Sequence, residues 1–313
     1  MKILALQCRE FEVFKRYLEG HDVRCPNDAD DDFLEEVDIV LAHSWKKLEK
    51  LLPKMKKLKM IQVFSAGVDH FDFSKIPENV VVCSNAGSNS WGVAEHALAL
   101  IFAALKHTVY RHNEMLRGNF PQMLPSKLLR GKNVGLIGLG NIARDLSSML
   151  RCFHVNLLGV SRSGRCSFCK DFIFVGKMDQ LDFLLANSDI IVLALPLTRE
   201  TMGLIDGKKL KMMKEDAILV NVSRGRIIVE KDLYEHLKNH PNFTAAIDAW
   251  WHYGEGFRQN YPFEKLPNVI LSPHCAGSYE GFWKDLTISA AENIKKFIAG
   301  TPKNVVRRED YLD

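Results

Sequence analysis

The segment NVGLIGLGNIA, residues 133–143, is the strongest indication of the architecture of this chain. The apolar run 134–137 is typical of a buried strand, and a helical pattern follows the glycines. Gly138 permits a tight turn, Gly140 lets the backbone approach a pyrophosphate, and the small Ala143 lets the helix pack on the strand. The stretch therefore predicts a strand–turn–helix unit whose helix N-terminus faces a dinucleotide phosphate. The residues expected at the pyrophosphate are Gly138, Gly140, Asn141 and Ile142.

The next strand ends in GVSRSGR, residues 159–165, and this ending bears on the choice of cofactor. Enzymes that use NAD usually carry Asp or Glu at this point to bind the ribose 2′-hydroxyl, and no acid lies near Ser161. Hydroxyl groups and a guanidinium instead suit a 2′-phosphate. We therefore predict NADP in preference to NAD. The expected contacts are Ser161, Arg162 and Ser163; the alternative is that Arg162 and Arg165 are solvated loop residues.

Outward from this unit, short apolar runs alternate with longer amphipathic segments, which is typical of βαβ units. The strands expected in the first part are 3–7, 22–25, 39–43, 60–64 and 80–84. Those expected after residue 132 are 134–137, 157–160, 190–195, 217–222, 245–247 and 269–272. A long helix is expected over 93–117 and a last helix over 282–299. The fold class is therefore α/β, with two doubly wound parallel sheets that are buried on both faces.

Length and composition are consistent with a two-domain globular protein. The chain has 313 residues, of which 47% are hydrophobic, and a length of this order usually divides into two domains. Its 42 basic and 38 acidic residues give a net charge of +4, which does not indicate a nucleic-acid partner. No apolar run is long enough to span a membrane, and the N-terminus lacks the pattern of a signal peptide. A cytoplasmic location is therefore expected.

The seven cysteines are scattered, and Cys166 and Cys169 form a C-x-x-C pair. A structural zinc site usually needs two such pairs, and a redox pair usually opens a helix. The simplest interpretation is a surface loop with free thiols, and no metal site is expected. Disulfide or metal chemistry at Cys166 and Cys169, with Cys152 and His154 upstream, is the alternative.

Four later segments make the pattern specific. They are LPLT (195–198) with Thr201, NVSRG (221–225), AIDAW (246–250) and SPHCAG (272–277). In this order, downstream of the glycine turn, they resemble the D-isomer-specific 2-hydroxyacid dehydrogenase family. The resemblance covers nearly the whole chain, from SAGVD (65–69) to Gly277. Each motif alone is modest, whereas the ordered set is highly specific.

The resemblance implies hydride transfer between a nicotinamide cofactor and a 2-keto or 2-hydroxy acid. Such a reaction needs a proton donor for the developing alkoxide and a cation that holds the carboxylate. His274 resembles the acid/base histidine of the family, and imidazole exchanges protons near neutral pH. Arg224 resembles the substrate arginine, whose planar fork can bind the carboxylate and the carbonyl oxygen together. Both residues follow buried strands, where open α/β sheets place their sites.

Further site residues are implied by the same resemblance. Asp248 is expected to face the nicotinamide. The substrate carboxylate is expected on the loop of Ser65, Ala66 and Gly67, where glycine allows close approach. The remaining cofactor contacts are expected from Pro196, Thr201, Val222, Ser223, His274 and Gly277.

The resemblance also implies a domain division and an assembly. A flavodoxin-like substrate domain would comprise residues 1–90 and 282–313. A Rossmann cofactor domain would comprise residues 91–281. The helix 93–117 and the arm that follows it resemble the dimer contact of the family, so a homodimer is expected.

One position departs from the family pattern. Most catalytic members pair the histidine with a glutamate in the loop after the Asp248 strand, but spacing places Tyr253 there, and Glu255 lies two residues further on. Either Glu255 takes the place of the usual acid, or Tyr253 acts as a neutral partner of His274, or the pair is absent and activity is weak. The aromatic residues of this loop either shape the substrate pocket or pack between the domains, and we favour packing. They are Trp250, Trp251, Tyr253, Phe257, Tyr261 and Phe263.

The favoured function is reduction of glyoxylate, hydroxypyruvate or a similar small 2-keto acid with NADPH. One alternative is a dehydrogenase of a larger or phosphorylated 2-hydroxy acid. It would need more cations than Arg224, and no cluster in the first domain clearly supplies them. The other alternative is a non-catalytic NADP-binding sensor on the same fold, which the missing glutamate favours and the presence of Arg224 and His274 opposes.

Overall fold

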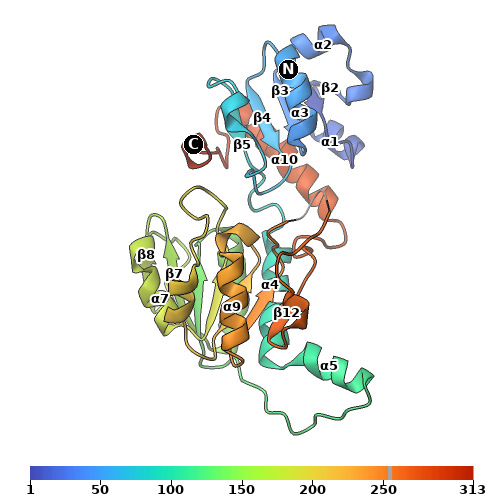
Figure 1. The fold of residues 1–313 in the computed structure, drawn as a ribbon. Helices are drawn as coiled ribbons and strands as arrows, with labels where there is room; N and C mark the ends of the chain where they lie inside the picture. The colour runs from blue at the N-terminus through green and yellow to red at the C-terminus, as the bar shows by residue number, and fades with distance from the viewer. Residues whose placement is uncertain (253–255, 313) are drawn as a thin grey trace. The chain divides into compact units, whose positions relative to one another are not determined.

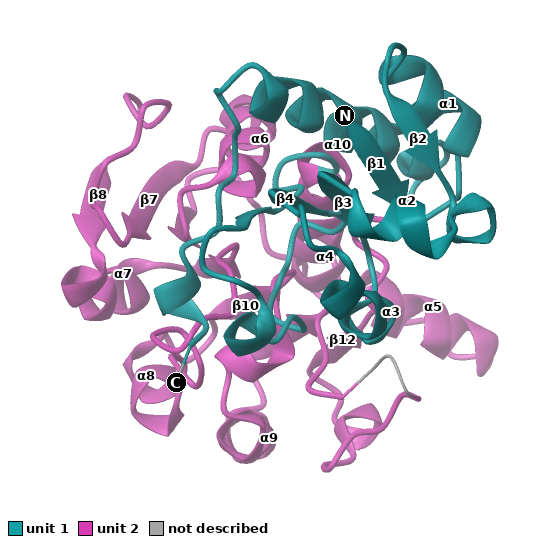
Figure 2. Ribbon diagram, turned by 90° about the horizontal axis from the view of Figure 1, so that it is seen from above, with its two compact units in different colours: residues 1–89, 279–313 teal, residues 90–278 magenta. Residues whose placement is uncertain are grey.

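A computed structural model describes residues 1–252 and 256–312, and its chain forms two compact units (Figure 2). Unit 1 comprises residues 1–89 and 279–313, and unit 2 comprises residues 90–278. Each unit contains one sheet in which all the paired strands are parallel. The predicted α/β class with two parallel sheets is confirmed.

Unit 1 contains a five-stranded sheet in the order β2-β1-β3-β4-β5 (Figure 1). Its strands are β1 (Lys2–Ala5), β2 (Asp22–Arg24), β3 (Ile39–Ala42), β4 (Met60–Val63) and β5 (Val81–Cys83). Its helices are α1 (Phe11–Tyr17), α2 (Asp31–Glu35), α3 (Trp45–Leu51) and α10 (Phe282–Ile298). Successive residues of β1 point to opposite faces: Ile3 packs with α1 and α10, and Leu4 packs with α2 and α3. Both faces are therefore covered, as the continuous apolar strands require.

Unit 2 contains a seven-stranded sheet in the order β12-β11-β10-β9-β6-β7-β8. Its strands are β6 (Asn133–Ile137), β7 (Asn156–Ser161), β8 (Phe174–Lys177), β9 (Ile190–Leu193), β10 (Ile218–Asn221), β11 (Thr244–Ile247) and β12 (Val269–Leu271). Its helices are α4 (Ser90–Leu105), α5 (Thr108–Leu116), α6 (Asn141–Leu150), α7 (Leu181–Asn187), α8 (Gly207–Met212) and α9 (Glu230–Asn239). Helices α4 and α6 cover one face of the sheet, and α7, α8 and α9 cover the other.

Eleven of these strands were predicted, and two expectations were wrong. The edge strand β8 was missed because its sequence, FVGK, has only two apolar residues before Gly176 and Lys177 and so lacks the apolar run of a central strand. The helix expected over 93–117 is two helices, because His107 adopts φ = 52° between them. Helix α4 buries one face along its whole length, whereas no residue of α5 is buried, so the chain leaves the core at this point. Among the described helices, none is both long and apolar enough to cross a bilayer.

The expectation of free thiols in the C-x-x-C loop was also wrong. Cys166 and Cys169 form a disulfide in the loop between β7 and β8, with their Cα atoms 5.5 Å apart. A second disulfide, which the sequence did not indicate, joins Cys8 and Cys25. It links the segments that follow β1 and β2, so it braces the carboxyl ends of two neighbouring strands.

A histidine in the core of unit 2 predicts how stability depends on pH. His236 on α9 stacks on His240 with a ring distance of 4.0 Å. Burial, followed by the charges of His240 and Lys211, lowers the pKa of His236 from 6.5 to about 4. As the pH falls below 6.5, His236 becomes protonated in the unfolded chain but stays neutral in the folded chain. The free energy of unfolding therefore decreases as the pH falls, until His236 also becomes protonated in the folded chain near pH 4.

We therefore expect His236→Gln to lose less stability than the wild type on acidification. The expected difference between pH 7 and pH 4.5 is about 2 kcal/mol in the free energy of unfolding, because the lowered pKa of the buried His236 acts over most of this pH range. Urea unfolding at the two pH values measures it. Parallel losses in the two proteins would contradict the assignment.

Candidate active site

The glycine turn lies where β6 meets α6, at the carboxyl edge of the unit 2 sheet. Gly138 adopts φ = 95°, and a Cβ atom added to it would lie 2.5 Å from the carbonyl oxygen of Ala194. Only glycine fits this position without a shift of the backbone. At Gly140 an added Cβ would meet nothing within 4 Å, so the space in front of the first turn of α6 is open. Buried Ala143 packs α6 on the sheet. The turn thus fits the pyrophosphate of a dinucleotide.

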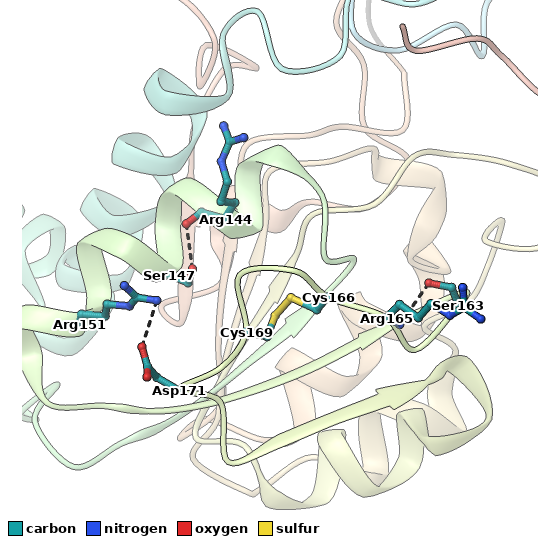
Figure 3. The surroundings of a disulfide bond; sticks show 8 residues. All are labelled: Arg144, Ser147, Arg151, Ser163, Arg165, Cys166, Cys169 and Asp171. Carbon is teal, nitrogen blue, oxygen red and sulfur yellow. Dashed lines mark hydrogen bonds and ion pairs between the residues drawn. A yellow bond between two sulfur atoms is a disulfide. The ribbon is translucent and has the colours of Figure 1, made fainter.

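At the end of β7 a polar group is available for the ribose end of such a cofactor. The Ser161 hydroxyl is buried and has no hydrogen-bond partner among the described residues. Buried polar atoms are normally satisfied, so this hydroxyl fits a ligand that supplies the partner. Arg162 Nε lies 3.3 Å from Glu200 Oε2 in an exposed ion pair. The loop then continues through Ser163 and Arg165 into the disulfide (Figure 3).

The loop after β9 is fixed by hydroxyl groups. Thr201 Oγ1 donates to the carbonyl oxygen of Pro196 at 2.7 Å and accepts from the Thr198 amide at 2.8 Å. Ser223, beyond β10, donates to the carbonyl oxygen of Leu193 at 2.6 Å. These bonds join the ends of β9 and β10, so the residues predicted there as cofactor contacts lie on one sheet edge.

Arg224 stands at the carboxyl end of β10 and is half-buried. Its Nη1 donates to the carbonyl oxygen of Ser223 at 2.9 Å, and Asn221 Nδ2 donates to the carbonyl oxygen of Arg224 at 3.0 Å. A Cβ atom on Gly225 would lie 2.2 Å from the carbonyl carbon of Trp250, so this glycine permits the close passage of two backbones. The arginine is therefore held by a rigid turn.

His274 lies beside a buried carboxylate. Asp248, which follows β11, is 2% exposed, and one of its oxygens accepts hydrogen bonds from the Ser272 hydroxyl at 2.5 Å and the Cys275 amide at 2.9 Å. Its other oxygen accepts from the Ala276 amide at 3.1 Å and lies 4.0 Å from His274 Nδ1. The carboxylate thus holds the Ser272 side chain before His274 and the backbone that follows it. The histidine adopts φ = 56°, and its side chain is 36% exposed.

The structure adds His96, which the sequence analysis missed. His96 Nε2 on α4 lies 2.9 Å from Ser272 Oγ and 3.6 Å from Asp248 Oδ1. Since the single proton of the Ser272 hydroxyl goes to Asp248, His96 must be the donor to Ser272. The chain His96–Ser272–Asp248 therefore supports the loop of His274 from the helix side. His96, Asp248 and Cys275 could also surround a cation, but hydrogen bonds within the protein already use the carboxylate.

Strand order brings these groups to one edge. β10, β11 and β12 are neighbours, with Asn221 paired to Ile247 and Ile247 paired to Leu271. Arg224, Asp248 and His274 follow these three strands within a few residues, so they lie at the same edge as the glycine turn. Gly277 lies in the His274 loop, and Val222 is buried beside Ser223.

Unit 1 presents the predicted carboxylate loop separately. Ser65 to Gly67 follow β4, and the Ser65 hydroxyl donates to the carbonyl oxygen of Gly67 at 2.8 Å. The carbonyl oxygen of Ser65 accepts a hydrogen bond from the Asn85 amide at 3.0 Å. This bond anchors the loop to the segment after β5. Ala66 is exposed at the tip of this loop.

Most of the aromatic residues after β11 pack the core of unit 2. Trp250 is 4% exposed, and its indole N–H donates to the carbonyl oxygen of Ser272 at 2.7 Å. Trp251 stacks on buried Phe263 at 5.5 Å, and Tyr261 also packs on this core. These residues therefore pack within the core of unit 2, so the expectation that they pack between the domains was wrong for them, and Phe257 is exposed. Tyr253 and Glu255, proposed partners of His274, lie outside the described residues.

Comparison with known proteins agrees with this geometry. The family model of the D-isomer-specific 2-hydroxyacid dehydrogenase NAD-binding domain matches residues 98–276. A glyoxylate reductase of Aeropyrum pernix is 32% identical over 269 residues, which cover 83% of this chain and 79% of that protein. A D-3-phosphoglycerate dehydrogenase of Archaeoglobus fulgidus is 30% identical over 273 residues, 84% of this chain. The match covers 50% of that relative, so the chain spans about half of its length.

A solved structure shows the same fold. An acyclic imino acid reductase in complex with NADPH and D-Arg superimposes with a TM-score of 0.82 at 25% identity. The match covers 98% of this chain and 100% of that one.

Proposed function

The chain belongs to the D-isomer-specific 2-hydroxyacid dehydrogenase family, and from this premise we propose that it reduces glyoxylate, hydroxypyruvate or a similar small 2-keto acid with NADPH. The product is the D-2-hydroxy acid. The observation that carries the proposal is the convergence of Arg224, Asp248 and His274 on the sheet edge that holds the glycine turn.

Reduction of a keto acid needs a hydride donor, a group that binds the carboxylate and a proton donor. The nicotinamide, when bound, supplies the hydride to the carbonyl carbon. Arg224 binds the substrate carboxylate and polarises the carbonyl oxygen, because its planar fork offers two donors. His274 gives its proton to that oxygen as negative charge develops on it. In unit 1, the loop of Ser65 to Gly67 has backbone N–H groups that suit a carboxylate.

Asp248 supports His274 in this proposal. Its carboxylate is buried and lies 4.0 Å from His274 Nδ1. It also accepts hydrogen bonds from the amides of Cys275 and Ala276, which follow His274. Asp248 is thus a positioning residue that holds the His274 loop.

One assay tests the proposal. The full chain is mixed with NADPH and a panel of 2-keto acids, and the loss of NADPH absorbance is followed for the wild type and for His274→Ala and Arg224→Ala. We expect turnover of a small keto acid that both substitutions abolish. Turnover that survives both would exclude this site, and no turnover with any keto acid would favour a non-catalytic sensor.

For the cofactor we propose NADP, with a 2′-phosphate bound by Ser161, Arg162 and Ser163. The buried hydroxyl of Ser161 without a partner in the described chain and the missing acid at the end of β7 support it. Glu200 Oε2, 3.3 Å from Arg162 Nε, must give way to the phosphate. Because the ion pair is exposed, its displacement costs little.

We therefore expect Arg162→Ala to raise the KM for NADPH by about 10- to 100-fold and to leave that for NADH within about twofold. Glu200→Gln should lower the KM for NADPH a few-fold, because it removes a competing anion. Steady-state kinetics with both cofactors measures these changes. Arg151→Ala is the control, since Arg151 pairs with Asp171 elsewhere on this side of unit 2 (Figure 3). Equal effects on NADPH and NADH would contradict a 2′-phosphate contact.

We also propose that α5 and the arm after it bind a second copy of the chain. Helix α5 extends away from the seven-stranded sheet (Figure 1), and large apolar residues here are exposed: Leu116 by 74%, Phe120 by 72% and Met123 by 88%. An apolar patch of this kind indicates a partner surface.

Phe120→Asp with Met123→Asp is accordingly expected to convert a dimer to a monomer in sedimentation analysis. Charge placed inside an apolar interface loses its hydration, so association should weaken by about 100-fold or more. Phe183→Asp, on the exposed side of α7, is the control. A wild-type chain that sediments as a monomer would rule the dimer out.

A further inference from the structure

Unit 1 contains a cavity of about 710 Å³ at the carboxyl edge of its sheet. Three separate segments line it. They are residues 6–9 after β1, residues 25–27 after β2, and the side of α3 that carries Lys47, Lys50 and Leu51. All of them belong to unit 1, so this unit forms the cavity alone.

The position of the cavity follows from strand order. β1 lies between β2 and β3 in the sheet. The chain therefore passes from β1 to β2 on one side of β1, and then crosses to β3 on the other side of β1. The connection through α1 covers one face of the sheet, and that through α2 covers the opposite face. Where consecutive connections diverge in this way, the loops separate and leave a crevice beyond the carboxyl ends of the strands. The cavity is therefore a consequence of the topology.

The charges around the cavity are of one sign. Arg9, Lys47 and Lys50 line it, and no carboxylate occurs among its described lining residues. The Arg9 guanidinium lies over the ring of Trp283, 4.1 Å from its centroid. This contact fixes the plane of the guanidinium and leaves its edge for an anion.

Lys47 and Lys50 differ from other lysines of unit 1, which form ion pairs with carboxylates. Lys54 lies 2.7 Å from Asp31, and Lys57 lies 2.8 Å from Glu36, each in an ion pair with a neighbouring element. In the described part of the chain, neither of the two cavity lysines has such a carboxylate within ion-pair distance. Lys54 and Lys57 are neutralised by protein carboxylates, whereas the cavity lysines can be neutralised by a ligand.

A histidine near the rim reports the same positive field. The pKa of His43, which follows β3, is lowered by burial and then by the positive charges of His70, Arg9 and Lys47. A bound anion would offset this repulsion.

Part of the cavity lining is apolar. Leu6, which is 7% exposed, and Leu51 both line it. The Cys8–Cys25 disulfide connects two of the loops that line the cavity, so these loops are held together. A lining with apolar and cationic side chains suits a ligand with a short hydrocarbon body and an anionic end.

We propose that this cavity is a binding site for a small organic anion, a carboxylate or a phosphate monoester with a short carbon chain. This cation cluster was not predicted from the sequence, because Arg9 lies 38 positions before Lys47. The proposal does not depend on the reaction proposed for Arg224 and His274.

Calorimetric titration of the full chain tests the site with three probes: glycerol 3-phosphate, butyrate and, as the neutral control, glycerol. We expect saturable binding of at least one anion with a Kd of about 1 mM or tighter, and no binding of glycerol. Tighter binding of glycerol 3-phosphate assigns the site to phosphate monoesters, and tighter binding of butyrate assigns it to carboxylates. All titrations are repeated in Arg224→Ala, so that an anion bound at Arg224 is not counted.

Two matched variants locate the binding. Lys47→Ala with Lys50→Ala should weaken the anion about 10- to 100-fold, because each charged hydrogen bond contributes strongly. Lys15→Ala with Arg16→Ala removes the same charge from α1, outside the cavity, and should change the Kd by less than about twofold. Thermal unfolding verifies that both proteins fold. No saturable binding of either anion, or equal weakening in both variants, would overturn the site.

Discussion

His274→Asn is expected to lower kcat for keto-acid reduction by about 10²- to 10⁴-fold, the usual contribution of a positioned general acid. Asparagine tolerates the left-handed backbone conformation that His274 adopts at φ = 56°, so the loop should keep its shape. The KM for the cofactor should change little, because the glycine turn and the end of β7 are untouched.

His154 provides a matched control for that substitution. It is also exposed and also adopts a left-handed conformation, with φ = 55°, but it lies at the far end of α6. His154→Asn should retain kcat within about twofold. The wild-type pH–rate profile should contain a limb that His274→Asn lacks. A variant with normal kcat and an unaltered profile would remove His274 from proton transfer.

Arg224→Ala is expected to lower kcat/KM by about 10³-fold, because a charge-assisted, two-donor contact to the carboxylate is lost. We expect KM to rise and kcat to fall, because the same guanidinium group binds the substrate and polarises its carbonyl oxygen. Arg224→Lys should recover only part of the loss, because an ammonium group cannot supply the planar pair of donors.

Arg226→Ala separates this effect from a general loss of positive charge. Arg226 is two residues further along, exposed, and contacts Met202 Sδ at 3.4 Å. Its removal should change kcat/KM by less than about threefold. Comparable losses in Arg224→Ala and Arg226→Ala would show that the field of the protein, and not a specific contact, attracts the acid.

The parallel α/β architecture and the order of the site motifs could be predicted from the amino-acid sequence. The turn at Gly138 and Gly140 depends on residues a few positions apart, because backbone freedom and helix approach are local properties. The same holds for the strands before Arg224, Asp248 and His274, since a short apolar run is visible in any window of the chain. Adjacent parallel strands then share one carboxyl edge, which is why the motifs could be expected together.

The contacts between distant segments could not be predicted from the sequence and became visible in the folded chain. His96 meets Ser272 across 176 positions, because α4 packs against the end of the sheet that holds β12. The break at His107 and the edge strand β8 depend on which surfaces the core covers, and a window of sequence does not contain that information. The cation cluster in unit 1 arose in the same way: the strand order brought its members together. Local chemistry specifies elements, whereas packing selects their neighbours.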